Sequence, residues 1–462
     1  MSWSKKQLSI LITVSISSFM GTFLVSSINI ALPAIEKSFG LNAISLSWII
    51  TAFLVATGMF LLPVGKLGDV SGNVRLFKLG LIIFTLASAL CAVSPSGTWL
   101  VVARFVQGAG SAFTNTTGQA ILVANFPARN RGQVIGISVA SVYTGLATGP
   151  FIGGFLTQSL GWHSLFYVAV VLGILSTIIA FAFLEKDANE PGDKKKIDLQ
   201  GTFVFMLGLV ALVYGSSHIP SVFGWMLMAF GIMMLILFWI IESRLANPMF
   251  ETRLFTHNKL FGFSNLAALI NYTATSAIVF FLSLYLQKTQ GLSPREAGAV
   301  IIAQPVMMAL FSPVVGRLSD KIQPRYFATL GMAMCSVGLF AMSFFTSATP
   351  LGLIVLVLVW EGLGFAFFSS PNMNTIMSSV DKSRYGQASG IASSMRIFGQ
   401  IVGMTIVTFF FAFYFGDKAV TVIEDNIFLT AMKWGFITFA LISLAGIYFS
   451  FTRGNVERKL GE

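Results

Sequence analysis

Residues 65–75 read Gly-Lys-Leu-Gly-Asp-Val-Ser-Gly-Asn-Val-Arg and lie between two long apolar runs. A second version, Gly-Arg-Leu-Ser-Asp-Lys-Ile-Gln-Pro-Arg, occupies residues 316–325. Both stretches begin with Gly, a basic residue, Leu, a small residue and Asp, and both end on Arg. A polar turn that occurs twice in so apolar a chain predicts a protein built from two repeats.

The composition places the chain in a membrane. Of its 462 residues, 55% are hydrophobic and 10% are charged, and the mean hydropathy is +0.81. Soluble domains carry about 25% charged residues, so this chain cannot cover itself with polar surface in water. Long apolar runs between short polar turns favour helices over the short alternating strands of a barrel. We therefore expect an all-α integral membrane protein.

Fourteen apolar segments reach the length of about 20 residues that a bilayer requires. They are predicted at 8–30, 45–65, 75–94, 97–121, 132–155, 163–184, 200–219, 222–242, 260–286, 295–316, 325–346, 351–373, 386–413 and 428–451. With the N-terminus inside, most of the 29 Lys and Arg fall in cytoplasmic segments. This predicts two cytoplasmic termini, and it explains the net charge of +11 without any nucleic-acid partner.

The repeat extends beyond the polar turn. Residues 107–110 correspond to 361–364, and the glycine spacing of residues 132–149 returns in residues 386–403. Spans 1–6 therefore pair with spans 9–14, and spans 7–8 are an insertion. The predicted domains are an N-terminal six-helix bundle at 1–185, a cytoplasmic linker with the inserted helices at 186–258, and a C-terminal six-helix bundle at 259–462. Parallel repeats of this kind place a substrate site near mid-membrane.

In these motifs the chain resembles the major facilitator superfamily, and more narrowly its fourteen-span drug:proton antiporter branch. Residues 65–75 are similar to the signature loop between spans 2 and 3, and residues 104–110 to the span-4 motif with its buried Arg. Residues 145–154 resemble the span-5 motif of exporters, and residues 29–33 the end of span 1. The resemblance covers nearly the whole chain. It implies two bundles that alternate access in a bacterial inner membrane.

The chain departs from the branch at one acid. The branch usually carries Asp in span 1, five residues before Asn29, where this chain has Leu24. The second signature loop also lacks its later Gly and has Gln323-Pro324 instead. The missing acid favours neutral or anionic cargo over dications.

Glu361 is the acid that we expect to carry protons. It lies ten residues into the span that begins at Leu351, about 15 Å deep at ~1.5 Å per residue. An ionised carboxylate there costs on the order of 2.5–3.5 kcal/mol, so the group is expected to bind a proton readily. The alternative is a purely structural acid, held neutral or paired with Arg396 at similar depth in span 13.

Arg104 has no visible acidic partner in its own repeat. We expect it to bond to backbone carbonyls or to amide side chains such as Asn29, Gln107 or Asn115. The resemblance implies a part in proton coupling, together with Glu361 and Arg396, and the alternative is a helix-packing anchor.

The signature loops imply a conformational latch between the halves. Its residues would be Gly65, Asp69, Gly72, Arg75, Asp320 and Arg325. From its place at the end of span 2, Asp69 is expected to cap a neighbouring helix and to pair with Arg75. In span 5, glycines three to four residues apart allow close helix packing and Pro150 adds a kink. The resemblance implies that Gly145, Gly149, Pro150, Gly153 and Gly154 form a hinge motif, and plain close packing is the alternative.

Polar side chains within spans usually face partners or water, because lipid cannot satisfy them. On this ground the candidate substrate-binding residues are Ser26, Asn29, Asn115, Asn271, Tyr272, Gln304, Trp360 and Asn372. For any one of them a helix contact is the simpler alternative.

Together these patterns predict a proton-driven exporter of hydrophobic or amphipathic small molecules, monomeric and surrounded by lipid. The main alternative is an exporter or flippase of an endogenous lipid or metabolite. An enzyme is not expected, because the sequence has no nucleophile elbow, no metal-ligand spacing and no Walker loop. The expected energy source is a proton gradient, and no cofactor or metal is expected.

Overall fold

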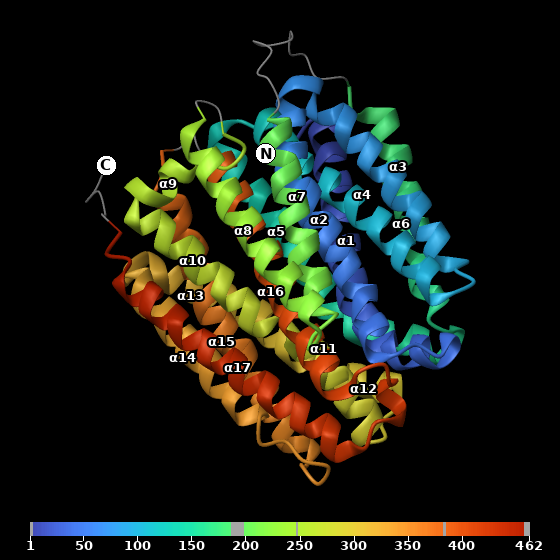
Figure 1. Ribbon diagram of the computed structural model, residues 1–462. Helices are drawn as coiled ribbons and strands as arrows, with labels where there is room; N and C mark the ends of the chain where they lie inside the picture. The colour runs from blue at the N-terminus through green and yellow to red at the C-terminus, as the bar shows by residue number, and fades with distance from the viewer. Residues whose placement is uncertain (1–2, 186–197, 246–247, 382–384, 457–462) are drawn as a thin grey trace. The chain divides into compact units, whose positions relative to one another are not determined.

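The computed structural model describes residues 3–185, 198–245, 248–381 and 385–456, apart from the side chains of residues 69, 128–132, 320, 385 and 386. Everything drawn as ribbon is helical or connects helices (Figure 1). The first half contains α1 (Lys5–Phe39), α2 (Ala43–Ser71), α3 (Asn73–Ala92), α4 (Gly97–Asn125), α5 (Ala128–Leu160), α6 (His163–Phe183), α7 (Leu199–Ser216) and α8 (Val222–Arg244).

The second half contains more, shorter elements. They are α9 (Thr252–His257), α10 (Lys259–Thr275), α11 (Ala277–Leu284), the π-helical turn η1 (Tyr285–Thr289), α12 (Pro294–Ile301), α13 (Ala303–Lys321), α14 (Pro324–Met342), α15 (Leu351–Ser378), α16 (Tyr385–Phe415), the 3₁₀ turn η3 (Val420–Val422) and α17 (Asp425–Thr452). Two predicted spans are thus interrupted, one between α10 and α11 at Ser276 and the other between α12 and α13 at Ile302.

Local sequence signals set the helix ends. Ser4 forms a capping box with Gln7 at the start of α1, and Asn42 and Ser96 cap α2 and α4 with their side chains. Gly40 ends α1 at φ +63°, a left-handed conformation that glycine adopts without a steric penalty.

Thirteen helical segments in the described part are long and apolar enough to cross a membrane. Each overlaps one of the predicted spans. The remaining prediction, 97–121, coincides with α4, which is long enough at 29 residues but carries polar groups such as Arg104 and Gln107. The all-helical membrane fold is therefore confirmed, and the count of fourteen stays a prediction.

The chain forms two compact units. The first comprises residues 1–250, 282–299 and 408–423, and the second comprises 251–281, 300–407 and 424–462. In the first unit α1 packs on α5, α4 packs on α2 and α3, and α7 pairs with α8. In the second unit α15 packs on α13 and α14, and α17 packs on α10 and α14. The domain boundaries predicted from the sequence, at 185/186 and 258/259, are not tested by this division and stay a prediction.

The same glycines make the same contacts in both units. A Cβ at Gly145 of α5 would meet the backbone of α1 at Phe19 and Phe23, and one at Gly399 of α16 would meet the backbone of α10 at Leu269. These two glycines correspond in the sequence repeat. The repeat is therefore a repeat of helix packing, with a small residue wherever two backbones approach closely.

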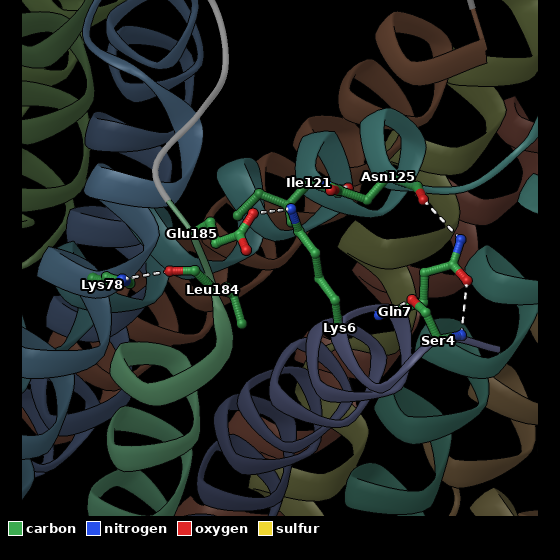
Figure 2. A network of polar contacts seen from close by, with 8 residues as sticks. All are labelled: Ser4, Lys6, Gln7, Lys78, Ile121, Asn125, Leu184 and Glu185. Atoms are coloured by element: carbon green, nitrogen blue, oxygen red, sulfur yellow. Dashed lines mark hydrogen bonds and ion pairs between the residues drawn. The ribbon is translucent and has the colours of Figure 1, made fainter.

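A polar network ties together one end of the first unit (Figure 2). Gln7 donates to the carbonyl of Asn125 at the end of α4, at 3.2 Å. Lys78 of α3 donates to the carbonyl of Leu184 just after α6, at 2.7 Å. Next to it, Lys6 lies 2.5 Å from the carboxylate of Glu185. The network fixes the first turn of α1 against the ends of α4 and α6.

The Lys6–Glu185 pair predicts a small pH dependence of stability. The hydrogen bond and charge of Lys6 lower the pKa of the exposed Glu185 below its ordinary value of 4.5. The stabilisation is thus present above that value and is lost as the pH falls through the lowered pKa. Replacing Lys6 by Met should lower the thermal midpoint near neutral pH and have less effect in acid or in high salt.

The neighbouring exposed Lys5 provides the control, and Lys5→Met should leave the midpoint nearly unchanged at every pH. A difference between Lys6→Met and the wild type that stays constant from neutral to acidic pH would contradict the assignment.

Candidate functional site

The most distinctive buried group is the carboxyl of Glu361 in α15. Its side chain is 0% exposed. The side chain lies against α14, where Gly338 leaves room for it, because a Cβ at that glycine would overlap the carboxyl group. The thiol of Cys335 lies beside it. Within the described residues, neither carboxyl oxygen has a partner with hydrogen-bonding geometry.

Comparison of the two sequence repeats shows why Glu361 lacks polar side-chain partners. Glu361 corresponds to Gln107 in the first repeat, where Arg104 donates to the amide oxygen at 2.5 Å and the amide nitrogen donates to Ser88 at 2.6 Å. The spacing of 254 residues that relates Gln107 to Glu361 places Leu358 at the position of Arg104. The spacing of 251 residues that relates Gly65 to Gly316 places Leu339 at the position of Ser88. The second repeat therefore keeps the polar position and surrounds it with apolar side chains.

Arg396 does not form an ion pair with Glu361 in the described part of the chain. Arg396 lies half-buried in α16. The alternative in which Arg396 locks Glu361 as a structural acid is therefore not the arrangement found. The carboxyl is left without a counter-charge.

Arg104 has the contacts expected from the sequence. Its guanidinium is fully buried, donates to the carbonyl of Ile49 at 3.0 Å and to Gln107, and stacks over the ring of Phe53 at 4.3 Å. One terminal nitrogen has no partner in the described part of the chain. Arg104 thus joins α4 to α2, while any part in proton coupling stays a proposal.

Most candidate substrate-binding residues are engaged in helix contacts. Ser26 donates to the carbonyl of Leu146 at 3.1 Å, Asn115 donates to Ser111 at 3.1 Å, and Tyr272 stacks edge-on with Phe365. Trp360 is 42% exposed and donates to the carbonyl of Met334, and Gln304 is buried in α13. The other three candidates, Asn29, Asn271 and Asn372, differ in the contacts of their amide oxygens.

The amide oxygens of Asn29 and Asn271 are buried and have no partner among the described groups. The oxygen of Asn372, by contrast, accepts from Arg453 at 2.5 Å. Asn29 and Asn271 therefore keep free hydrogen-bonding capacity inside the protein, and Asn372 does not.

The latch residues can be placed only in part. Gly72 joins α2 to α3 at φ +91°, and its N–H bonds to the carbonyl of Gly68. Arg75 is exposed, and Arg325 donates to the hydroxyl of Tyr326 at 2.9 Å. A Cβ at Gly65 would lie 3.4 Å from the Cγ2 of Thr116. The predicted partners Asp69 and Asp320 have side chains outside the described set, so the expected acid–base pairs remain predictions.

The span-5 glycines serve two different neighbours. Gly145, Gly149 and Gly153 face α1, where a Cβ at Gly153 would overlap Ser27. A Cβ at Gly154 would instead overlap the carbonyl of Pro294 at the start of α12. In return, a Cβ at Gly298 of α12 would overlap the carbonyl of Pro150, so the two helices approach each other through a pair of glycines.

No sequence pattern predicted that Arg453 is buried. It follows α17, in a position that reads as part of a solvated terminus, yet it is 2% exposed. It donates to Asn372 and, at 3.3 Å, to Ser264, which joins α17 to α15 and α10. Burial lowers the pKa of its guanidinium to about 9, so the group is still charged at neutral pH.

Comparison with known proteins decides the family. The family model described as Major Facilitator Superfamily matches the chain twice, over residues 14–268 and 264–461. The chain belongs to the Major Facilitator Superfamily. It is accordingly a transporter and not an enzyme, and the double match agrees with the two repeats.

Several named relatives align over most of the chain. Riboflavin transporter RibZ of Clostridioides difficile is 31% identical over 418 residues, covering 88% of this chain and 89% of the relative. Multidrug resistance protein Stp of Mycobacterium tuberculosis is 30% identical over 412 residues, covering 87% and 76%. Cephamycin export protein CmcT of Amycolatopsis lactamdurans is 31% identical over 401 residues, covering 84% and 82%.

Solved structures agree on the fold. The human organic anion transporter MFSD10 (TETRAN) superposes with a TM-score of 0.67 at 14% identity, covering 96% of this chain and 99% of its own. A bacterial homologue of the human lysosomal transporter Spinster gives 0.68 at 16% identity, with 98% of each chain covered. At these identities the likeness shows the superfamily fold alone.

Proposed function

We propose that this protein is a secondary active exporter of the fourteen-span drug:proton antiporter branch. It moves hydrophobic or amphipathic small molecules out of the cell by alternating access, in exchange for protons. It works as a monomer in the inner membrane, with both termini in the cytoplasm. The relatives named for multidrug resistance and cephamycin export support this substrate class.

The observation that carries the coupling mechanism is the isolated carboxyl of Glu361. Among the described groups the carboxyl has no counter-charge, and only the Cys335 thiol and the backbone N–H of Leu339 lie near it, neither in good hydrogen-bonding geometry. A carboxyl group in such surroundings is more stable neutral than ionised. It releases its proton only when water or a donor reaches it, which a change of conformation supplies. Ionisable groups at this depth generally mark ion pathways. Arg104 and Arg396 are the basic groups proposed to act with it.

The remaining motifs have proposed roles in the conformational cycle. The polar turns around Asp69 and Asp320, closed by Arg75 and Arg325, act as the latch, and the glycines of α5 form the hinge. Substrate contacts are proposed for Asn29 and Asn271, whose oxygens are unpartnered, and with less support for the other polar residues named above.

The test is transport by the wild-type protein in everted membrane vesicles. An imposed pH gradient should drive uptake of ethidium or of a neutral fluorescent amphiphile, and collapsing the gradient should stop it. Uptake that ignores the gradient would refute antiport. The absence of the span-1 acid predicts that the neutral amphiphile is the better cargo.

A second candidate is an exporter of an endogenous metabolite or lipid. It is favoured by the relative named as a riboflavin transporter and by Leu24 in place of the usual acid. A deletion strain separates the two candidates: altered drug sensitivity supports the first, and an altered profile of cell metabolites or lipids with unchanged sensitivity supports the second.

A further inference from the structure

Two acids meet where the inserted helices α7 and α8 come together at their polar end. Asp198 caps the N-terminus of α7, and its Oδ1 accepts from the N–H of Gly201 at 2.9 Å. Glu242 lies in the last turn of α8, and its Oε2 accepts from the N–H of Phe250 at 2.9 Å. Each carboxyl group therefore uses one oxygen to hold a backbone N–H.

The other oxygen of each acid is buried without a donor. Asp198 Oδ2 and Glu242 Oε1 have no hydrogen-bond partner in the described part of the chain. Glu242 is 1% exposed. Both free oxygens lie over Gly201: a Cβ there would be 3.0 Å from Glu242 Oε1 and would overlap Asp198 Oδ2. The side chains of the two acids are within hydrogen-bonding reach of each other.

The surroundings supply no compensating cation among the described groups. α7 contains no charged residue, and α8 contains only Glu242 and the exposed Arg244. α2, which also packs on α7, carries Lys66. The charged group that acts on Glu242 is Asp198, and neither acid forms an ion pair within the described residues.

Two carboxylates in contact cannot both stay ionised, because like charges at this separation repel strongly in a poorly solvated place. We propose that Asp198 and Glu242 bind one proton between them, as a carboxyl group that donates to a carboxylate. This proton-binding site is separate from Glu361. It lies on the hairpin of α7 and α8, which has no counterpart in the sequence repeat. The proton belongs to the pair rather than to either residue.

The shared proton has a structural consequence. It allows both acids to stay where they hold the first turn of α7 and the chain at Phe250. When the proton leaves, repulsion between the two carboxylates opposes this arrangement. The hairpin is then bound less firmly to the segment that leads to the second repeat.

Infrared spectra of the purified full-length protein test the proposal directly. Glu242→Gln and Asp198→Asn each replace the shared proton by an amide N–H that donates in the same place. Asn also keeps the helix cap. Each variant should lose the absorption of one protonated carboxyl group at neutral pH, and this absorption should remain in Glu361→Gln. Glu251→Gln, a nearby acid outside the pair, should lose none.

Thermal unfolding gives a second readout. The folded wild type holds a proton that the unfolded chain releases above the ordinary pKa of a carboxyl group, about 4. Its midpoint should therefore fall as the pH rises above that value, until the pair itself loses the proton. In Glu242→Gln the midpoint should fall less steeply with pH, because one proton fewer is released on unfolding. If that variant does not fold, Asp198→Asn serves alone.

Two results would overturn the proposal. One is a pair of variants with the same carboxyl absorption and the same pH slope as the wild type. The other is saturable stabilisation of the wild type by sodium or calcium that disappears in Glu242→Gln, which would mean that a metal cation occupies the pair. Neither outcome depends on transport, so the proposal stands or falls separately from the proposed function.

Discussion

Replacing Glu361 by Gln should abolish proton-driven transport, reducing uptake in everted vesicles to the level of vesicles without the protein. Gln has the shape of the neutral acid but cannot release a proton. Because the side chain of Glu361 packs against Gly338 and Cys335, the neutral amide fits where the protonated acid fits, and the fold should be kept. Substrate exchange in the absence of a gradient should therefore survive.

This separation of exchange from driven uptake is the decisive comparison. Glu424→Gln, which removes an exposed acid of the same unit, should transport like the wild type in both assays. If Glu361→Gln accumulates substrate as well as the wild type, Glu361 is a structural acid and the coupling lies elsewhere. If both exchange and driven uptake vanish, binding or folding has been lost, and the thermal midpoint distinguishes these two causes.

Gly145→Ala should destabilise the protein by about 1–3 kcal/mol, as overpacking of a tight contact does. A Cβ at Gly145 would lie 2.6 Å from the carbonyl oxygen of Phe19 and 2.9 Å from the nitrogen of Phe23. Both are backbone atoms of α1, so no side chain can turn aside and the two helices must move apart. The thermal midpoint of the purified protein measures the effect.

The same helix supplies a control substitution that is not expected to destabilise the protein. Gly136 lies in α5 with nothing within 4 Å of the position of a Cβ. Gly136→Ala should therefore leave the midpoint unchanged or raise it, because Ala is favoured over Gly in a helix by about 1 kcal/mol. Equal effects of the two substitutions would show that helix propensity, and not the α1–α5 contact, governs this region. Loss of transport in Gly145→Ala at a temperature where it stays folded would support a hinge at this crossing.

The membrane spans predicted from the sequence agree with the helices of the structure because hydropathy is a local property of each segment. Thirteen predicted spans coincide with helices that satisfy the criteria for crossing a membrane, and the glycine correspondence between Gly145 and Gly399 reappears as equivalent helix contacts. The hydrogen bond between Arg104 and Gln107 was also accessible from the sequence, since three residues apart on a helix brings side chains together.

The class of the protein, the positions of its spans, its repeat and the lack of polar neighbours of Glu361 along α15 could all be predicted from the sequence. Which groups meet across helices could be found only in the folded chain. It left Glu361 without Arg396, buried Arg453 against Asn372, and brought Asp198 to Glu242, 44 positions away in the sequence. The physical reason is that burial in a membrane follows from composition over one helix, whereas the partner of a buried charge depends on how two helices are rotated and on where a glycine leaves room.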